Sequence, residues 1–329
     1  MADDKKQRYE RIAVEEGFTS PEIAAERRKL MPAGFVPPPF QKATFEALTD
    51  LGEGRIKAMD RDGIAKQLCL LAGSVFQDLD PVQGGELAAL ANDRLAAAAK
   101  KYPDRIAGLA AFAPRDPLRA ARELERGVKT LGLKGGIVNS HSLGEYLDDR
   151  KFWPIFEAVQ AMDVPIYIHP RDPSPQMIGP YDVFGFKIGW SWAAETGTHI
   201  IRLIGAGVFD QFPKLRIIIG HMGEGLPFHL DRIDNRYVWE HEMAGRTPKL
   251  KRKPSDYLRD NLVVTTSGAN YAPPLLMTMQ ALGVDNILFA ADYPFEDVAA
   301  SVAAMDAMPI ADSDKRKIYS GNAKRVFKL

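Results

Sequence analysis

The stretch from Leu215 to Gly225 reads LRIIIGHMGEG and changes from apolar to polar within a few residues. The unbroken apolar run of residues 217–219 favours a strand buried on both faces, as in a parallel sheet. Gly220 permits the backbone to turn where the strand ends, which places His221 and Glu224 at its carboxyl end. Ligands and chemistry gather at this end of the strands in α/β proteins, so the pair is a candidate for a functional site.

Seven further segments repeat this pattern of a short apolar run, and amphipathic helices alternate with them. The predicted strands cover residues 11–15, 65–72, 106–113, 133–140, 164–170, 215–221, 261–268 and 285–294. The predicted helices cover residues 19–30, 50–62, 85–102, 118–131, 152–162, 195–209 and 272–282, with one more after the sixth strand. Alternation of strands and helices requires parallel crossover connections, and eight such strand–helix units close into a barrel. The sequence therefore predicts an α/β protein with a single (β/α)₈ TIM barrel domain over residues 1–329, which includes a short N-terminal extension.

Composition limits the classes of partner. The 43 basic and 43 acidic residues cancel, which argues against nucleic acid or a membrane surface and favours a small-molecule ligand. We expect no signal peptide and no membrane span, because the N-terminus is charged and no apolar run reaches eighteen residues. The single cysteine, Cys69, lies in an apolar run and is predicted to pack in the core. These features predict a soluble, cytoplasmic protein.

Polar side chains with metal-ligand chemistry follow four of the predicted strands. Glu15 follows the first strand, His169 the fifth, His221 the sixth and Asp292 the eighth. One histidine would be weak evidence, but in a barrel all four side chains converge on the same face. Imidazole and carboxylate ligands together suit one divalent ion such as Zn²⁺ or Mn²⁺ and do not distinguish between the two.

Several motifs also carry a resemblance to a known family. The motifs are RIAVEE, IYIHP, GHMGEGLP, TTSG and ADYPFE, and together they span nearly the whole chain. In order and spacing they resemble the amidohydrolase-superfamily barrels of the aminocarboxymuconate-semialdehyde decarboxylase type. Among these barrels the chain is most similar to metal-dependent, O₂-independent γ-resorcylate and 5-carboxyvanillate decarboxylases. The resemblance implies non-oxidative decarboxylation of a hydroxylated aromatic acid by a homo-oligomer, either a dimer or a tetramer.

The same resemblance implies roles for individual residues of the site. Glu15, His169 and Asp292 would bind the metal ion. His221, with Glu224 behind it, would form a hydrogen bond near Asp292. The chemistry of decarboxylation also needs an acid that protonates the ring carbon, and Asp292 is the candidate in a pocket of low polarity.

Further residues are expected to contact the substrate. By the resemblance, Arg232 would help to organise the site or the substrate, and Phe35 would be the substrate-contacting aromatic residue. Phe295 directly follows the DYP triplet and is expected to line the pocket, and His169 is expected to face the substrate as well. Flat apolar walls of this kind suit a planar ring.

The sequence departs from the family at three places. One is Phe295, where the 5-carboxyvanillate branch carries a tyrosine after the DYP triplet. Gly17 stands where many relatives have a histidine ligand, so a water or a substrate atom would fill that place. Relatives that accept a second carboxylate carry an arginine on an early loop, but the region near Lys42 offers none, and Arg55 falls within the predicted helix 50–62. A substrate with a single carboxylate is therefore expected.

Two other functions compete with decarboxylation. A metal-dependent hydrolase of an amide or lactone would use the same ion to activate water, with Asp292 taking its proton. The fourth strand, however, ends at residues 138–140 without the lysine that would favour two metals, since Lys134 lies at its beginning. A catalytically silent barrel would have lost metal ligands, whereas only the position of Gly17 has changed.

Overall fold

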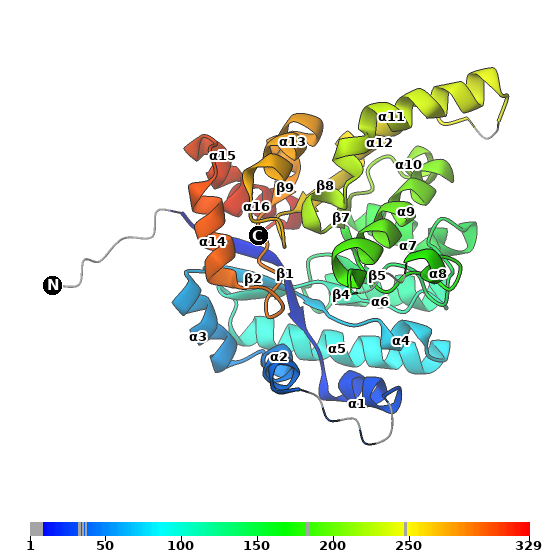
Figure 1. Cartoon of the computed structure of the whole chain (residues 1–329). Coiled ribbons are helices and arrows are strands. Elements are labelled where there is room, and N and C mark those ends of the chain that lie inside the picture. Colours follow the sequence, from blue (N-terminus) through cyan, green and yellow to red (C-terminus); the bar gives the residue numbers. More distant parts are fainter. Residues whose placement is uncertain (1–8, 32–33, 35, 37, 182–184, 247–248) are drawn as a thin grey trace.

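Parallel strands form the centre of the computed structural model, and helices surround them (Figure 1). The structure describes residues 9–329, apart from residues 32–33, 35, 37, 182–184 and 247–248. None of the helices in these ranges has the length and apolar character needed to traverse a lipid bilayer.

The strands form the predicted barrel. They are β1 (Ile12–Phe18), β2 (Lys66–Leu71), β3 (Ile106–Gly108), β4 (Ala110–Ala111), β5 (Gly136–Asn139), β6 (Ile166–His169), β7 (Ile217–Ile219), β8 (Leu262–Thr265) and β9 (Ile287–Leu288). All pairings are parallel, and β3 and β4 are two halves of the third barrel strand. Backbone hydrogen bonds close the ring, because Val14 N donates to Phe289 O over 3.0 Å and Leu109 N donates to Cys69 O over 3.0 Å. The (β/α)₈ prediction is confirmed.

The helices cover the outside of the strands. They are α1 (Pro21–Lys29), α2 (Pro39–Thr49), α3 (Glu53–Asp62), α4 (Val75–Asp78), α5 (Pro81–Lys101), α6 (Pro117–Lys129), α7 (Trp153–Met162), α8 (Ile178–Tyr181), α9 (Trp192–Gly205), α10 (Val208–Gln211), α11 (Leu226–Val238), α12 (Pro254–Asn261), α13 (Ala272–Leu282), α14 (Val298–Ala307), α15 (Asp312–Arg316) and α16 (Asn322–Phe327). Ser20 caps helix α1, because its side chain accepts the N–H of Ile23 over 3.3 Å.

Burial follows the apolar pattern of the sequence. The three isoleucines of β7 are fully buried, as expected for a strand covered on both faces. Cys69 is buried in β2 and forms no disulfide. The core therefore lies inside the barrel and between the barrel and its helices.

Several of the predicted elements are wrong in their bounds. The predicted helix 195–209 is two helices, α9 and α10, because the chain turns at Gly207, which has φ +76°. Helix α2 was not predicted at all, since the sequence around it is rich in proline. The predicted strands 215–221 and 285–294 extend past the ends of β7 and β9, and the overrun segments form turns at the barrel mouth.

Candidate metal centre

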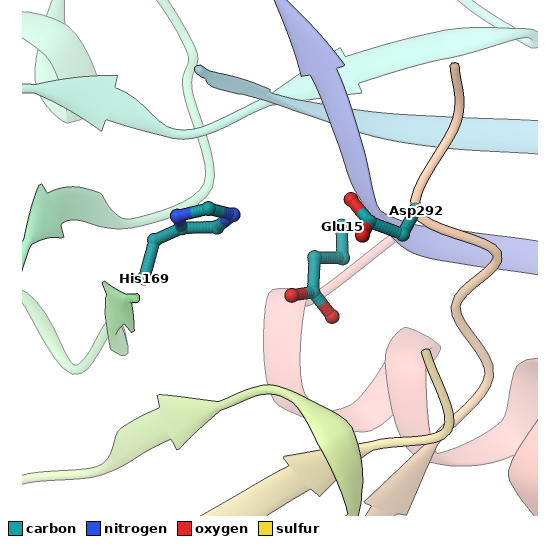
Figure 2. Close-up of side chains that lie close together, drawn as sticks. All are labelled: Glu15, His169 and Asp292. Carbon is teal, nitrogen blue, oxygen red and sulfur yellow. The ribbon is translucent and has the colours of Figure 1, made fainter. Parts of the chain in front are cut away.

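Three side chains of the predicted ligand set lie together at the carboxyl ends of the strands. Glu15 belongs to β1, His169 ends β6, and Asp292 follows β9. One ligand atom from each lies within 4.8 Å of the others. Figure 2 shows the three side chains entering a common space from separate segments of the chain. Among the described residues, this is the group of histidine and carboxylate side chains suited to a metal ion.

Glu15 presents one oxygen to this space. The side chain is fully buried, and its Oε2 accepts hydrogen bonds from Thr265 Oγ1, at 2.5 Å, and from Ser267 Oγ. Its Oε1 is buried and has no hydrogen-bond partner in the described part of the chain. A Cβ at Gly220 would come within 2.7 Å of Oε1, so only glycine leaves that oxygen free. A buried, unpartnered carboxylate oxygen requires a cation or another donor.

His169 is held in the tautomer that binds metals. Its Nδ1 lies 2.8 Å from the carbonyl oxygen of Pro170. A carbonyl oxygen can only accept, so Nδ1 carries the proton and the lone pair of Nε2 is available. Burial lowers the pKa of His169, which favours the neutral imidazole that a metal ion needs.

Asp292 completes the set of ligands. Burial, and then the charge of Glu15, raise the pKa of Asp292 well above its usual range. Two neighbouring carboxylates disfavour each other's ionisation, and a cation between them would relieve the repulsion. Because metal–ligand bonds measure about 2.0 to 2.2 Å, small side-chain rotations would bring one ion into contact with all three residues. The two oxygens and one nitrogen fit a divalent ion such as Zn²⁺ or Mn²⁺.

His221 and Glu224 form a pair beside this cluster, in which the side chain of Glu224 is buried and that of His221 is partly exposed. His221 Nδ1 lies 2.9 Å from Glu224 Oε1. Burial opposes protonation of His221, but the charges of Glu224 and Glu15 outweigh it and raise its pKa to about 10. The charge of Asp292 acts in the same direction. We therefore expect an imidazolium whose Nδ1–H donates to Glu224.

The predicted substrate residues are less well placed. Arg232 is exposed on α11 and forms no hydrogen bond or ion pair with any residue that the structure describes, so its role stays a prediction. Phe35 lies outside the described residues. Phe295 is 51% exposed, and its ring comes within 3.2 Å of where a Cβ at Gly17 would lie. Since Leu48 comes within 3.1 Å of the same point, a larger side chain at Gly17 would displace these neighbours.

Sequence reasoning did not assign a role to three residues around Glu15. Thr265 and Ser267 hold its Oε2, and both belong to the TTSG motif at the end of β8. Tyr167 lies two residues before His169 on β6, so both side chains point to the same face of the strand. Its hydroxyl is buried without a partner in the described chain, and burial and the charge of Glu15 raise its pKa. The position of TTSG at a strand end could have indicated Thr265 and Ser267, and the two-residue spacing from His169 could have indicated Tyr167.

Solved structures with the same fold include enzymes crystallised with manganese. A 5-carboxyvanillate decarboxylase from Novosphingobium aromaticivorans, in complex with manganese and 4-hydroxy-3-methoxy-5-nitrobenzoic acid, is 39% identical and superimposes with a TM-score of 0.91. The match covers 98% of this chain and 96% of that chain. A dihydroxybenzoic acid decarboxylase from Polaromonas sp. JS666, with manganese and the inhibitor 2-nitroresorcinol, is 38% identical with a TM-score of 0.87. That match covers 98% of this chain and 97% of the other.

Sequence comparison points to the same group of proteins. The γ-resorcylate decarboxylase of Polaromonas sp. strain JS666 is 40% identical over 330 residues, which cover 97% of this chain and 98% of the relative. The amidohydrolase family profile matches residues 49–329. With the barrel and the ligand cluster in place, these matches show that the chain belongs to the amidohydrolase family.

Proposed function

We propose that this protein is a metal-dependent, O₂-independent decarboxylase of a hydroxylated aromatic carboxylic acid, of the γ-resorcylate type. One divalent ion, Zn²⁺ or Mn²⁺, would be held by Glu15, His169 and Asp292. The observation that carries the proposal is the convergence of these three side chains at the barrel mouth, with Glu15 Oε1 left free. Relatives that decarboxylate aromatic acids, and manganese in their crystals, support it.

In this mechanism Asp292 is the acid. Its carboxyl group lies at the barrel mouth beside the other two candidate ligands and would deliver a proton to the ring carbon that bears the carboxylate. A C–H bond forms from the π electrons of the ring, and the C–C bond to the carboxylate then breaks. Its electron pair restores the aromatic ring, CO₂ leaves, and Asp292 recovers a proton from solvent. The bound ion supplies Lewis-acid stabilisation of the phenolate and carboxylate oxygens of the substrate.

His221 and Glu224 support Asp292 in this proposal. An imidazolium beside the cluster stabilises negative charge that returns to Asp292 after proton transfer. Glu224 fixes the ring of His221 through Nδ1 and keeps its charge balanced. The left-handed backbone at His221 and Glu224, with φ of +52° and +53°, places both side chains within one tight turn.

We expect Glu224→Gln to lower kcat by about 10- to 100-fold, the usual scale for residues that orient a group of the site. Glutamine can still accept the Nδ1–H, but it carries no charge to stabilise the imidazolium. Steady-state kinetics at fixed Mn²⁺ measure the effect. The matched control is Glu125→Gln on α6, which removes a surface ion pair with Lys129. An unchanged rate in Glu224→Gln would assign that residue to the fold alone.

The fourth strand argues against the hydrolase alternative. At the tip of β5, Asn139 is engaged with Gln77, whose Oε1 accepts the backbone N–H of Asn139 at 2.7 Å. No lysine lies at this tip, and Lys134 precedes the strand. A second metal bridged to the first would need a ligand here. The arrangement therefore favours a single ion that binds an aromatic acid.

The number of carboxylates on the substrate depends on which cationic side chains can pair with them. Arg55 is fully buried, and its guanidinium donates to backbone and side-chain oxygens of its own surroundings. Lys42 is largely exposed on α2 and lies 4.0 Å from Glu46. Arg55 is committed to these partners, and Lys42 extends from the exposed side of α2. A second ring carboxylate left desolvated and unpaired would cost several kcal/mol.

We therefore expect 2,6-dihydroxybenzoate to be decarboxylated with a kcat/KM at least about tenfold above that for 5-carboxyvanillate, which corresponds to about 1.4 kcal/mol in transition-state binding. The measurement is CO₂ release from both acids by the same Mn²⁺-loaded protein, after metal analysis. One bound ion with turnover of lactones but no CO₂ release would instead support the hydrolase. A preference for the dicarboxylate would mean that another cation reaches the pocket.

We also propose that the protein acts in the cytoplasm as a homo-oligomer, either a dimer or a tetramer. The far end of helix α11 and the helical turn that follows it project beyond the neighbouring helices (Figure 1). Large apolar side chains are exposed on α11 and on this turn. Phe228 is 73% exposed and Met243 is 77% exposed. Apolar surface of this kind supports contact with a second copy. Light scattering coupled to gel filtration tests the oligomeric state.

A further inference from the structure

Glu16 binds the backbone on both sides of Asp292. Its side chain is fully buried next to Glu15 in β1. Glu16 Oε1 accepts the N–H of Ala291 at 3.0 Å, and Oε2 accepts the N–H of Tyr293 at 3.1 Å. One carboxylate therefore holds the two peptide groups that flank Asp292.

The local geometry of β1 explains why a side chain takes this role. The pairing of β1 with β2 is irregular between Ala13 and Glu16. On its other edge, β1 donates from Val14 N to Phe289 O and from Gly17 N to Tyr293 O, at 3.0 and 2.7 Å. Between these two backbone hydrogen bonds, the N–H groups of Ala291 and Tyr293 find their acceptors in the carboxylate of Glu16 and not in the backbone of β1.

Asp292 itself needs external support. Its φ is +60°, in the left-handed region that residues other than glycine rarely adopt. Such a conformation persists when the surrounding contacts determine it, and these residues concentrate at functional sites. The two hydrogen bonds to Glu16 are contacts of this kind, one on each side of Asp292.

A buried cation completes the arrangement. Arg55 donates from Nη2 to Gly17 O at 2.7 Å and from Nη1 to Gln67 Oε1 at 3.1 Å. Gln67 in turn donates from Nε2 to Glu16 Oε2 at 3.4 Å. Burial raises the pKa of Glu16 to about 7, and the hydrogen bonds from Ala291 and Tyr293 act against this. Three N–H donors converge on the two oxygens of Glu16, so the geometry favours its carboxylate form.

We propose that Glu16 is a positioning residue that holds Asp292 at the metal centre through the amides of Ala291 and Tyr293. Arg55 acts as its counter-ion through Gln67. The inference rests on the proposed metal-binding role of Asp292, but it does not depend on which reaction the protein catalyses. Metal affinity, rather than turnover, is therefore the property to measure.

The experiment is a double-mutant cycle on the dissociation constant of Mn²⁺, measured by calorimetry. The four proteins are the wild type, Glu16→Gln, Asp292→Asn and the double variant. Glutamine has one carbonyl oxygen for the two amides and turns its NH₂ group toward the other, so we expect Mn²⁺ to bind about 10- to 100-fold more weakly. In the Asp292→Asn background the same change should alter Mn²⁺ affinity less than about twofold, because the group that Glu16 positions is already gone.

Two further variants complete the experiment. One tests whether the length of the side chain at position 16 matters when its charge is kept, and the other tests whether a substitution elsewhere also weakens Mn²⁺ binding. Glu16→Asp keeps the negative charge opposite Arg55 but is too short to bind both amides, so it too should weaken Mn²⁺ binding. Asp234→Asn is the control, because Asp234 accepts the N–H of Ser255 at 2.8 Å on the outer helices, and its variant should bind Mn²⁺ as the wild type does.

Either of two results would overturn the proposal. One is wild-type Mn²⁺ affinity in Glu16→Gln and Glu16→Asp. The other is an equal loss with and without Asp292, which would mean that Glu16 acts elsewhere. A cycle that behaves as expected in a protein that releases no CO₂ would leave the positioning role standing and refute only the proposed reaction.

Discussion

Asp292→Asn is expected to lower kcat by at least about a thousandfold while the protein still binds some metal. General acid catalysis contributes about 10² to 10⁴ in rate. Asparagine cannot deliver a proton to the ring carbon, and its amide oxygen is a weaker ligand than a carboxylate. The other two ligands, Glu15 and His169, stay in place. The measurement pairs steady-state CO₂ release with metal analysis of the same preparation.

A surface aspartate serves as the control for this substitution. Asp285 lies 2.9 Å from Lys317 in an exposed ion pair, and Asp285→Asn makes the same chemical change away from the cluster. We expect it to leave both rate and metal content unchanged. Near-normal turnover in Asp292→Asn with full metal occupancy would assign proton delivery to another group, such as Tyr167, whose buried hydroxyl has no partner in the described chain.

Much of the fold could be predicted because local sequence signals mark where its helices and strands begin and end. Helix α13 begins and ends at the predicted residues, since Pro273 and Pro274 mark its first turn and Gly283 follows its last residue. Strand ends were harder to predict. The apolar run of β7 passes directly into a turn with left-handed residues at His221 and Met222, and no hydrophobic pattern reports that change of backbone conformation.

The site also contains some residues that the sequence could predict and others that it could not. The convergence of the three candidate metal ligands could be predicted because each directly follows a buried run, and the barrel topology brings the ends of such runs together. The residues that hold them could not. Ser267 reaches Glu15 across 252 positions of sequence, and Ala291 reaches Glu16 across 275. Contacts of this separation depend on strand register and side-chain direction, which a single sequence does not specify.

His169→Ala is expected to empty the metal site, in contrast to Asp292→Asn. His169 is the only nitrogen donor of the cluster in the described chain, and its Nδ1–H is fixed by Pro170 O so that Nε2 is presented for binding. We expect Mn²⁺ affinity to fall by more than the 10- to 100-fold that the loss of an orienting partner produces. Activity should fall with metal content. Calorimetric titration with Mn²⁺ and elemental analysis of the purified protein measure the two quantities.

The control is His229→Ala on the exposed face of α11, which removes an imidazole away from the cluster and should not change Mn²⁺ affinity. The two active-site variants then separate the two roles. Without His169 the site lacks its ion, so high concentrations of Mn²⁺ should restore part of the activity of His169→Ala. They should not restore Asp292→Asn, because added metal supplies no proton donor. Equal Mn²⁺ affinity in His169→Ala and the wild type would place the metal ion elsewhere in the barrel mouth.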